Sequence, residues 1–509
     1  MEYKVVDIEW ERCNLLLTFD KETKEILLSN NKDKILLKVY NKKVLIPLTN
    51  INEQMLDKGL WHLEVKGKRV GVDSSLLKEF DNLTRIFYYR NELYAYNVSF
   101  KYFEKVFYIN IHFMMENKKY KKYIRVFEGE KKKELIKNCF KLIGIKSLNI
   151  IYKLRRVFKN KHRKVILLLT ENSNHLTENL QALVKPLNEL PSKILIYCHD
   201  DINDKRISTY YKTTIMLAKS DIILIENYTP ILNILNLSKK TMIIQLWHAG
   251  VGFKAVGYAR FGKQGSPHPF FSSHRKYTYA IVDNNNLKDI YKEVFGLNED
   301  KIKAYGMPRL DNYFNKENII KTIKEIYTEY PYLKEKKIIL FAPTYRGATQ
   351  DTAHYDINQL DFALLNNFCK KNDFLFIIKL HPFIKEKVQI NSAYSDTIKD
   401  FSTYDINKLI YISDILITDY SSCVYEFSMF KRPIIYFRFD QEEYEYLRPY
   451  HGLDKASLDV VTDFKSLIEE LEKYKDIDTK KKLNGLKKIK KEESIPKIIK
   501  LIEEGLDKL

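Results

Sequence analysis

Short apolar runs that alternate with helical stretches constrain the fold of this chain more than any other feature of its sequence. Each run has three to five residues, the length of a buried strand, and is followed by a helical pattern or a loop. Alternating β and α elements of this kind build parallel sheets. Two series of strands are predicted, first Val165–Leu169, Ile194–Tyr197, Ile222–Ile225, Met242–Ile244 and Ala280–Val282, then Lys337–Phe341, Phe374–Ile378, Ile415–Thr418 and Ile434–Phe437.

The two series predict an α/β protein with two Rossmann-like sheet units, one at residues 164–312 and one at residues 313–475. Residues 1–114 contain short β-rich runs between Asn, Asp and Lys turns, which predict a small β-sandwich or barrel. Residues 115–163 predict a basic helical linker, and residues 476–509 predict a Lys-rich C-terminal helical region. A chain of 509 residues has room for this many domains.

The net charge of +20 is concentrated in residues 117–164, which contain 18 Lys and Arg but only 3 Glu. Apolar residues recur there at helical spacing, so a basic face and an apolar stripe share one helix. This pattern predicts a helix that lies on an anionic membrane surface. The alternative is a solvated helical linker with an ordinary buried stripe. The stripe consists of Leu135, Ile136, Cys139, Phe140, Leu142, Ile143, Ile150, Ile151, Leu154, Val157 and Phe158.

Several classes of protein are disfavoured by the composition. The five cysteines are scattered without metal-ligand spacing, which indicates reduced cytosolic thiols. The N-terminal segment has charges and no apolar core, unlike a signal peptide, and no apolar run has the length of a membrane span. The basic segment lacks regular aromatic interleaving, which argues against nucleic-acid binding. We therefore expect a cytoplasmic protein that is peripheral on the inner face of the cell membrane.

A histidine follows the fourth predicted strand of the first series. Trp247 and His248 begin a glycine-rich loop there, and Gly250 and Gly252 allow the backbone to approach a ligand closely. Ligands of open parallel sheets bind at the carboxyl ends of strands. Residues 241–282 contain no Asp or Glu but several basic residues, which favours an anionic substrate. The same loop loosely matches the dinucleotide-binding pattern G-x-G-x-x-A, but the acidic residue that would bind the ribose is absent. For His248 itself, the alternative interpretation is a hydrogen-bonded structural histidine.

Polar or charged residues follow all four strands of the second series, so this sheet edge predicts an anion site. Ser421 and Ser422 precede an apolar helical stretch, where a helix start presents backbone N–H groups. Glu426, one turn further on, is able to accept ribose hydroxyls. No P-loop is present and no D-x-D pair follows these strands, so we expect a transferase without metal or other cofactor. The cationic groups at this edge are Arg346, Lys379, His381 and Arg438.

Taken in order, the segments WHAGVGFKAVGYAR, FAPTYRG, KLHPF, TDYSSCVYEF and KRPIIYF resemble the CDP-glycerol glycerophosphotransferase family of teichoic-acid enzymes. Within that family the chain looks most like the ribitol-phosphate polymerases of wall teichoic acid, over nearly its whole length. The resemblance implies a GT-B core of two Rossmann-like domains. It also implies an acceptor hydroxyl that attacks the β-phosphorus of CDP-ribitol or CDP-glycerol and releases CMP. The implied acceptor is a lipid-linked teichoic acid, and the oligomeric state stays open.

The resemblance further implies roles for individual residues. His248 is the expected general base, and Glu426 is the expected contact to the donor ribose. One departure favours ribitol, because the glycerol enzymes tend to have WHGTPLK where this chain has WHAGVGFK. The alternatives are a CDP-glycerol-dependent transferase and a GT-B glycosyltransferase that uses a nucleotide sugar. The expected diphosphate-binding residues are Arg346, Lys379, His381, Thr418, Ser421 and Ser422, and the acceptor-side candidates are Trp247, Lys254 and Arg260.

Overall fold

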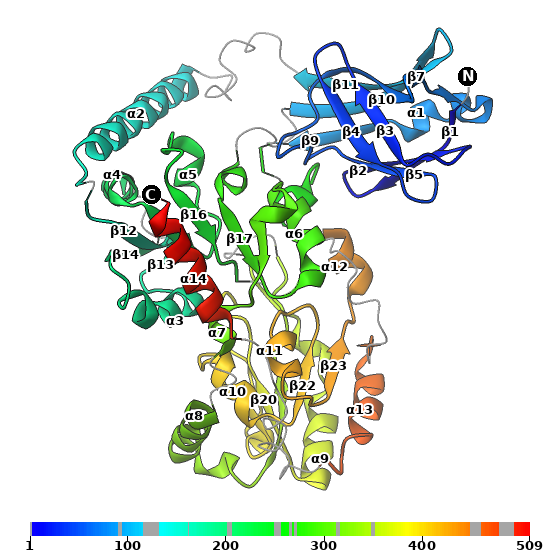
Figure 1. The fold of residues 1–509 in the computed structure, drawn as a ribbon. Coiled ribbons are helices and arrows are strands. Elements are labelled where there is room, and N and C mark those ends of the chain that lie inside the picture. The colour runs from blue at the N-terminus through cyan, green and yellow to red at the C-terminus, as the bar shows by residue number, and fades with distance from the viewer. Residues whose placement is uncertain are drawn as a thin grey trace.

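The chain is represented by a computed structural model. The residues that it describes are 3–89, 94–115, 132–160, 162–200, 206–248, 256–263, 267–268, 272–311, 316–347, 352–447, 460–477 and 493–508. Figure 1 shows three parts in chain order: a β-rich N-terminal part in blue, a first sheet unit from cyan to green, and a second sheet unit from light green to orange.

Two β-sheets form the N-terminal part and enclose one apolar core. The strand order is β5-β2-β1-β8 in one sheet and β4-β3-β6-β11-β10-β9 in the other, with β7 paired to β6. Buried and less buried residues alternate along β6, because successive side chains of a strand point to opposite faces. The strands are β1 (Lys4–Glu11), β2 (Asn14–Phe19), β3 (Glu25–Ser29), β4 (Lys34–Lys38), β5 (Lys43–Pro47), β6 (Gly59–Val65), β7 (Lys68–Arg69), β8 (Gly71–Val72), β9 (Arg85–Tyr89), β10 (Tyr94–Phe103) and β11 (Val106–Met115).

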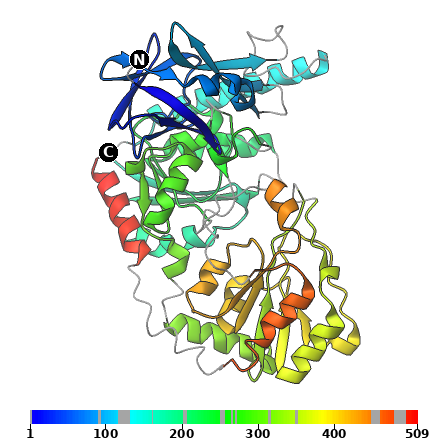
Figure 2. The same ribbon diagram turned by 90° about the vertical axis from the view of Figure 1, so that its right-hand side faces the viewer.

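The N-terminal part is attached to the first sheet unit, at the end away from the second unit (Figures 1 and 2). Arg12 forms an ion pair of 2.6 Å with Glu293 of the first unit. Arg275 of the first unit donates to the carbonyl oxygen of Thr49 at 2.6 Å. Phe261 extends from the first unit into the core of the N-terminal part. Polar and apolar contacts therefore fix the two parts together.

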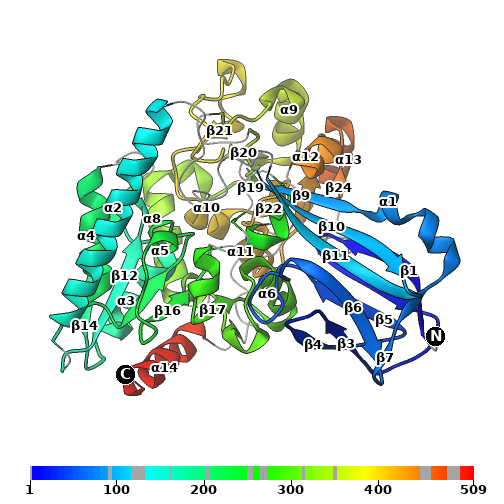
Figure 3. The same ribbon diagram turned by 90° about the horizontal axis from the view of Figure 1, so that it is seen from above.

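A long helix, α2 (Lys132–Val157), lies beside α4 (Ile207–Lys219) on the outside of the first unit (Figures 1 and 3). Leu148 and Tyr152 of α2 are buried in the core of that unit. The described part of the predicted linker is therefore packed against the first unit. Residues 116–131 of the same prediction lie outside the described residues.

The first unit has a seven-stranded sheet in the order β13-β14-β12-β15-β16-β17-β18, parallel except for the edge strand β13. All the strands predicted for this unit are present, and β12, β15 and β16 are buried along their whole length, as expected for strands covered on both faces. The strands are β12 (Val165–Thr170), β13 (Asn172–Ser173), β14 (Lys193–Asp200), β15 (Ile222–Ile225), β16 (Met242–Gln245), β17 (Tyr279–Val282) and β18 (Ile302–Ala304); the helices include α3 (Glu178–Leu187), α5 (Ile231–Ile234), α6 (Lys288–Phe295) and α7 (Pro308–Asp311).

The second unit has six parallel strands in the order β21-β20-β19-β22-β23-β24. The order reverses between β19 and β22, and ligands of open α/β sheets bind at the carboxyl ends of strands beside such a reversal. The strands are β19 (Lys337–Phe341), β20 (Phe374–Ile378), β21 (Ile398–Asp400), β22 (Ile415–Thr418), β23 (Ile434–Phe437) and β24 (Val460–Val461); the helices include α8 (Lys316–Glu329), α9 (Phe362–Asn372), α10 (Ile406–Ile412), α11 (Val424–Ser428), α12 (Gln441–Leu447) and α13 (Phe464–Glu472).

The last helix, α14 (Ser494–Asp507), lies along the first unit and not the second, as the red ribbon shows in Figures 1 and 2. Ile498 and Ile502 are fully buried against the strands of the first sheet. Asp311 of α7 accepts hydrogen bonds from the backbone N–H groups of the first two residues of α14. The first unit is therefore completed by residues that follow the second unit in the chain.

The predicted α/β class is confirmed, with several sheets in one chain. In the part of the chain that the structure describes, no helix is both long and apolar enough to cross a membrane.

Candidate active site

Trp247 turns the chain sharply where β16 ends. Its φ of +54° lies in the left-handed region, which costs a bulky L-residue roughly 1–2 kcal/mol. Surrounding contacts hold the strained residue in place: its N–H donates to Gln245 Oε1 at 2.9 Å, and its ring packs edge-on against Phe295. Strain of this kind is typical of functional sites. The turn places His248 beyond the carboxyl edge of the first sheet, with its side chain exposed.

Two side chains hold successive carbonyl oxygens of this turn. Asn179 Nδ2 of α3 donates to the carbonyl oxygen of Trp247 at 3.1 Å, and Arg309 Nη2 of α7 donates to that of His248 at 3.1 Å. Asn179 Oδ1 also accepts from the backbone N–H of Arg309 at 2.9 Å, so the two contacts are linked. The backbone at His248 is therefore held by two elements other than its own strand.

The imidazole of His248 is oriented by a backbone group. Its Nδ1 lies 3.4 Å from the carbonyl oxygen of Glu226, which directly follows β15. A carbonyl oxygen only accepts, so the proton of the neutral ring is on Nδ1 and the lone pair is on Nε2. This is the tautomer in which a histidine takes a proton from a substrate hydroxyl through Nε2.

Three carboxyl groups lie around Arg309: those of Glu226 and Glu426 are buried, whereas Glu178 is exposed. Burial raises the pKa of the Glu226 carboxyl to about 7, and the charge of Arg309 opposes this rise. Removal from water also raises the pKa values of Glu178 and Glu426. The charge of Arg309 opposes both rises without cancelling them. Arg309 is therefore the cation that offsets this acidic cluster.

Glu426, the predicted ribose contact, faces the first unit. Its carboxylate is 3% exposed, and its Oε1 lies 2.5 Å from Arg309 Nη2. The same guanidinium nitrogen contacts the carbonyl oxygen of His248. The structure thus brings the predicted base and the predicted ribose contact to two sides of one arginine.

His381 follows β20 and is half-buried. Its Nδ1 accepts a hydrogen bond from the backbone N–H of Phe383 at 3.2 Å, so the proton of the neutral ring is on Nε2. The ring lies between Tyr345 and Phe383, with centroid distances of 4.7 and 4.6 Å. Nε2 is then a hydrogen-bond donor, as a residue that binds phosphate oxygens requires.

Lys379 and Thr418 are buried and hydrogen-bonded to the backbone. Lys379 Nζ donates to the carbonyl oxygens of Leu380 and Ser402 at 3.1 and 2.8 Å, and burial lowers its pKa. Thr418 Oγ1 donates to the carbonyl oxygen of Ala342 at 2.7 Å. In this conformation both side chains fix the strand ends on which the site stands, and their contact with a diphosphate stays a prediction.

Arg346 is engaged by two carboxylates. Its guanidinium lies 2.8 Å from Asp419 and 2.5 Å from Asp440. Burial by itself lowers the pKa of Arg346, but the hydrogen bonds and charges of Asp440 and Asp419 raise it above its ordinary value. Its role as a diphosphate ligand stays a prediction, because in this conformation its charge is offset by both carboxylates. The aromatic rings around it are Tyr355, Tyr420, Phe439 and Tyr444.

Ser421 and Ser422 lie in the turn between β22 and α11. The helix begins at Val424, so Cys423 and neither serine is its N-cap residue. Ser421 Oγ accepts a weak hydrogen bond of 3.4 Å from the N–H of Cys423, and Ser422 is exposed. Both hydroxyls therefore stand at the carboxyl edge of β22, where the anion site was predicted.

The acceptor-side candidates differ in position. Trp247 is buried by its packing in the first unit, and Arg260 is half-buried at the end of a short 3₁₀ helix, Gly257–Arg260, near the N-terminal part. Lys254 lies outside the described residues, as do Gly250 and Gly252. Trp247 therefore helps to hold His248 in place, whereas Arg260 is not brought to the residues around His248.

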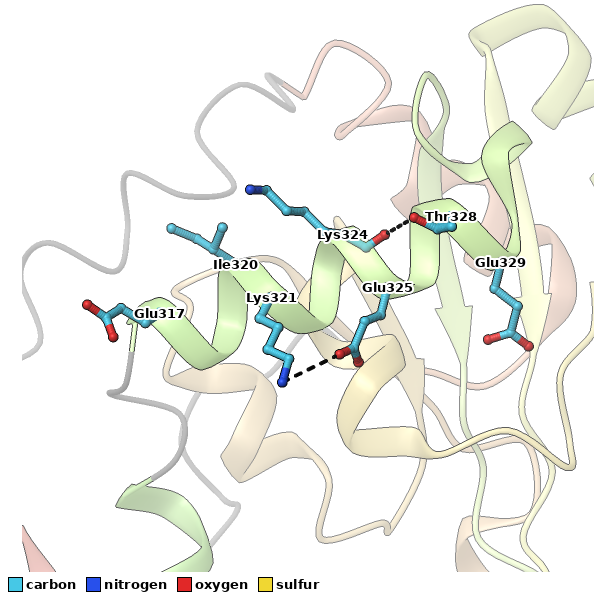
Figure 4. Close-up of a pocket in the computed structure, with 7 residues that line it drawn as sticks. All are labelled: Glu317, Ile320, Lys321, Lys324, Glu325, Thr328 and Glu329. Atoms are coloured by element: carbon cyan, nitrogen blue, oxygen red, sulfur yellow. Dashed lines mark hydrogen bonds and ion pairs between the residues drawn. The ribbon is translucent and has the colours of Figure 1, made fainter.

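The pocket in Figure 4 lies along one face of α8 and contains none of the predicted site residues. Lys321 and Glu325, one turn apart on this helix, form an ion pair of 4.0 Å. Among the described residues, no three His, Cys, Asp or Glu side chains are grouped as metal ligands. The candidate site is therefore the pair of strand ends joined by Arg309. The pocket is lined by Glu317, Ile320, Lys321, Lys324, Glu325, Thr328 and Glu329.

Residues 150–490 match the family described as CDP-Glycerol:Poly(glycerophosphate) glycerophosphotransferase. The match covers more than half of the chain, so the chain belongs to this family, as its motifs predicted.

Known proteins of similar sequence carry teichoic-acid names. The teichoic acid poly(ribitol-phosphate) polymerase of Bacillus spizizenii is 40% identical over 241 residues, which cover 47% of this chain and 39% of that protein. The teichoic acid ribitol-phosphate polymerase TarK of Staphylococcus aureus is 31% identical over 332 residues, which cover 63% and 64% of the two chains. The chain thus spans less than two thirds of each relative, 39% of the first and 64% of the second.

A solved structure shares the fold. The wall teichoic acid polymerase TagF, in a variant soaked with CDPG, aligns with a TM-score of 0.52 at 19% identity, and the alignment covers 72% of this chain and 97% of that one.

Proposed function

We propose that the chain transfers an alditol phosphate from a CDP-alditol to the hydroxyl end of a lipid-linked teichoic acid and releases CMP. Membership of the family and the names of the similar proteins support this activity. The observation that carries it is His248, whose Nδ1 is held by the Glu226 carbonyl so that Nε2 is the proton acceptor at the edge of the first sheet. Two such sheet units are the GT-B arrangement that nucleotide-dependent transferases use.

In this proposal the acceptor hydroxyl forms a bond to the β-phosphorus while the bond from that phosphorus to the CMP oxygen breaks. The hydroxyl proton moves to Nε2 of His248, and CMP leaves with the negative charge. Phosphoryl transfer depends mainly on in-line positioning and charge stabilisation. His381 Nε2–H and the hydroxyls of Ser421 and Ser422 donate hydrogen bonds to the diphosphate oxygens, and Glu426 accepts a hydrogen bond from a ribose hydroxyl.

Ribitol is the favoured alditol, because the relative at 40% identity is named a poly(ribitol-phosphate) polymerase. CDP-glycerol is the alternative donor, since two proteins named teichoic acid glycerol-phosphate primase are also similar to this chain, at 31% and 30% identity. The test is CMP release from CDP-ribitol and from CDP-glycerol, each with a lipid-linked acceptor. Turnover of CDP-glycerol alone would reverse the choice, and release of a nucleoside diphosphate from a nucleotide sugar would support a glycosyltransferase.

The helix α2 supports attachment to the inner face of the membrane. Phe140 and Phe158 are 70% and 82% exposed, and four further apolar side chains of this segment are exposed with them. Lys146 and Lys153 are exposed beside this apolar stripe, whereas Leu148 on the opposite side is buried. An exposed apolar stripe with flanking lysines suits an anionic lipid surface better than water. The four further side chains are Ile143, Ile150, Leu154 and Val157.

A further inference from the structure

Arg309 lies where the first unit, the connection between the units and the second unit meet. It belongs to α7, which follows the last strand of the first sheet. Its backbone N–H is bound by Asn179 of α3, and Asp311 on the same short helix binds the start of α14. The backbone of Arg309 is therefore anchored on two helices of the first unit.

The side chain of Arg309 extends from this anchor to the second unit. A single nitrogen, Nη2, contacts both Glu426 Oε1 at 2.5 Å and the carbonyl oxygen of His248 at 3.1 Å. Burying a carboxylate such as Glu426 is costly unless a cation is paired with it, so this contact resists separation. Any displacement of Glu426 relative to the first unit acts on the same nitrogen that holds the His248 backbone.

We propose that Arg309 is a positioning residue that couples donor binding at Glu426 to the placement of His248. The inference rests on the proposed function, in which Glu426 contacts the donor ribose and His248 is the base. A ribose hydroxyl that donates a hydrogen bond to Glu426 fixes this carboxylate. Arg309, held by the carboxylate, then keeps the His248 carbonyl and the attached imidazole at the distance that proton transfer requires.

A second contact between the units lies close to this one. Asn407 Nδ2 of α10 donates to Glu178 Oε1 of α3 at 2.6 Å. Glu178 and Glu226 also face Arg309, and Arg309 lowers the pKa of each. The arginine therefore stands among carboxyl groups of both units, where its loss changes the local charge as well as the contacts.

Substitution by lysine and by glutamine separates the two roles of Arg309. In Arg309→Lys an ammonium still pairs with Glu426, but a point charge does not reproduce the fixed fork of the guanidinium. We expect donor affinity close to that of the parent and a kcat that falls by about 10- to 100-fold, because small misplacements of a catalytic group have effects of this size. In Arg309→Gln we expect both donor affinity and kcat to fall.

The control is Arg12→Gln, which removes the ion pair with Glu293 between the N-terminal part and the first unit. It reports what the loss of a partly buried ion pair does where neither Glu426 nor the His248 carbonyl is a partner. We expect kcat and the donor dissociation constant of this variant to match those of the parent. An Arg309→Lys variant with the parent's kcat would overturn the inference.

A measurement that does not depend on turnover distinguishes this inference from the proposed function. In protein labelled with 13C at histidine Cε1, the His248 signal is identified by its loss in His248→Gln. We expect this signal to shift in Arg309→Gln and Arg309→Lys but not in Arg12→Gln. An unchanged His248 signal in both Arg309 variants overturns the positioning role. A parent that releases no CMP from either CDP-alditol overturns the proposed function instead, and the shift of the signal still tests the coupling.

Discussion

His248 and His381 are held in opposite tautomers by backbone groups. The carbonyl oxygen of Glu226 fixes a proton on Nδ1 of His248, whereas the N–H of Phe383 requires an unprotonated Nδ1 on His381. The Nε2 atom of one ring is therefore an acceptor and that of the other is a donor. In the proposed function these two states suit different tasks, proton removal by His248 on the first unit and anion binding by His381 on the second.

Replacing His248 by alanine should abolish transfer and leave donor binding largely intact. General bases typically contribute 10²- to 10⁴-fold, so CMP release should fall by about this factor. Isothermal titration with the CDP-alditol measures the second half of the prediction. If His248→Ala loses donor binding as well, the residue is a ligand or a folding residue and not the base. His112→Ala, on β11 of the N-terminal part, is the matched control.

Donor binding should weaken in His381→Ala and in the double variant Ser421→Ala with Ser422→Ala. Hydrogen bonds to charged groups contribute roughly 1.5–3 kcal/mol, which corresponds to about a 10- to 100-fold rise in the donor dissociation constant. The same titration checks it, with His112→Ala again as the reference. Dissociation constants equal to that of the parent in both variants would contradict the assignment of this edge to the diphosphate.

Glu226→Gln should stabilise the protein more at pH 8 than at pH 5. The folded pKa of Glu226 is raised from 4.5 to about 7 by burial. Between these values the unfolded carboxyl loses its proton while the folded one keeps it, so stability falls as the pH rises and then stays lower above pH 7. Glutamine does not ionise and avoids this loss, which is at most about 3 kcal/mol. Thermal unfolding at both pH values measures it, with exposed Glu325→Gln of α8 as the control. Equal effects of Glu226→Gln at the two pH values would disprove the raised pKa.

The parent protein should co-sediment with anionic liposomes at low salt, dissociate from them at high salt, and not bind purely zwitterionic liposomes. Each Lys near an anionic surface contributes about 1 kcal/mol, so replacing Lys146 and Lys153 by Glu should weaken binding at least about tenfold. Ile150→Ser with Leu154→Ser tests the apolar stripe separately. The matched control replaces Lys321 and Lys324 of α8 by Glu. Should the α2 variants sediment as well as the parent does, this helix face is not the membrane contact.

The sheets were predictable because each strand leaves a local pattern. The run Ile434–Phe437 coincides with β23, and the run Val165–Leu169 differs from β12 by one residue. The packing of α2 and α14 on the first unit was not predictable, because it depends on contacts between residues far apart in the chain. A local pattern indicates that a helix has an apolar face and does not indicate which sheet covers it.

The location of the candidate site was predictable to the extent that the ends of the strands determine it. His248, His381 and the two serines stand at the carboxyl edges where the sequence placed them. Side-chain partners were not predictable: the carboxylates around Arg346 come from the ends of two different strands, and the backbone oxygens around Lys379 from two loops. Asn179, Glu226 and Arg309 were missed, because none belongs to a pattern that carries chemistry by itself.

The position of α14 has a consequence for the order in which the chain folds during synthesis. The strands of the first sheet are made early, but the face that Ile498 and Ile502 cover stays open until the whole second unit has emerged. The second unit is able to complete its folding first, although its synthesis begins later. A ribosome-bound chain that stops before Ser494 should therefore carry a finished second unit and a first unit that offers an apolar surface to chaperones.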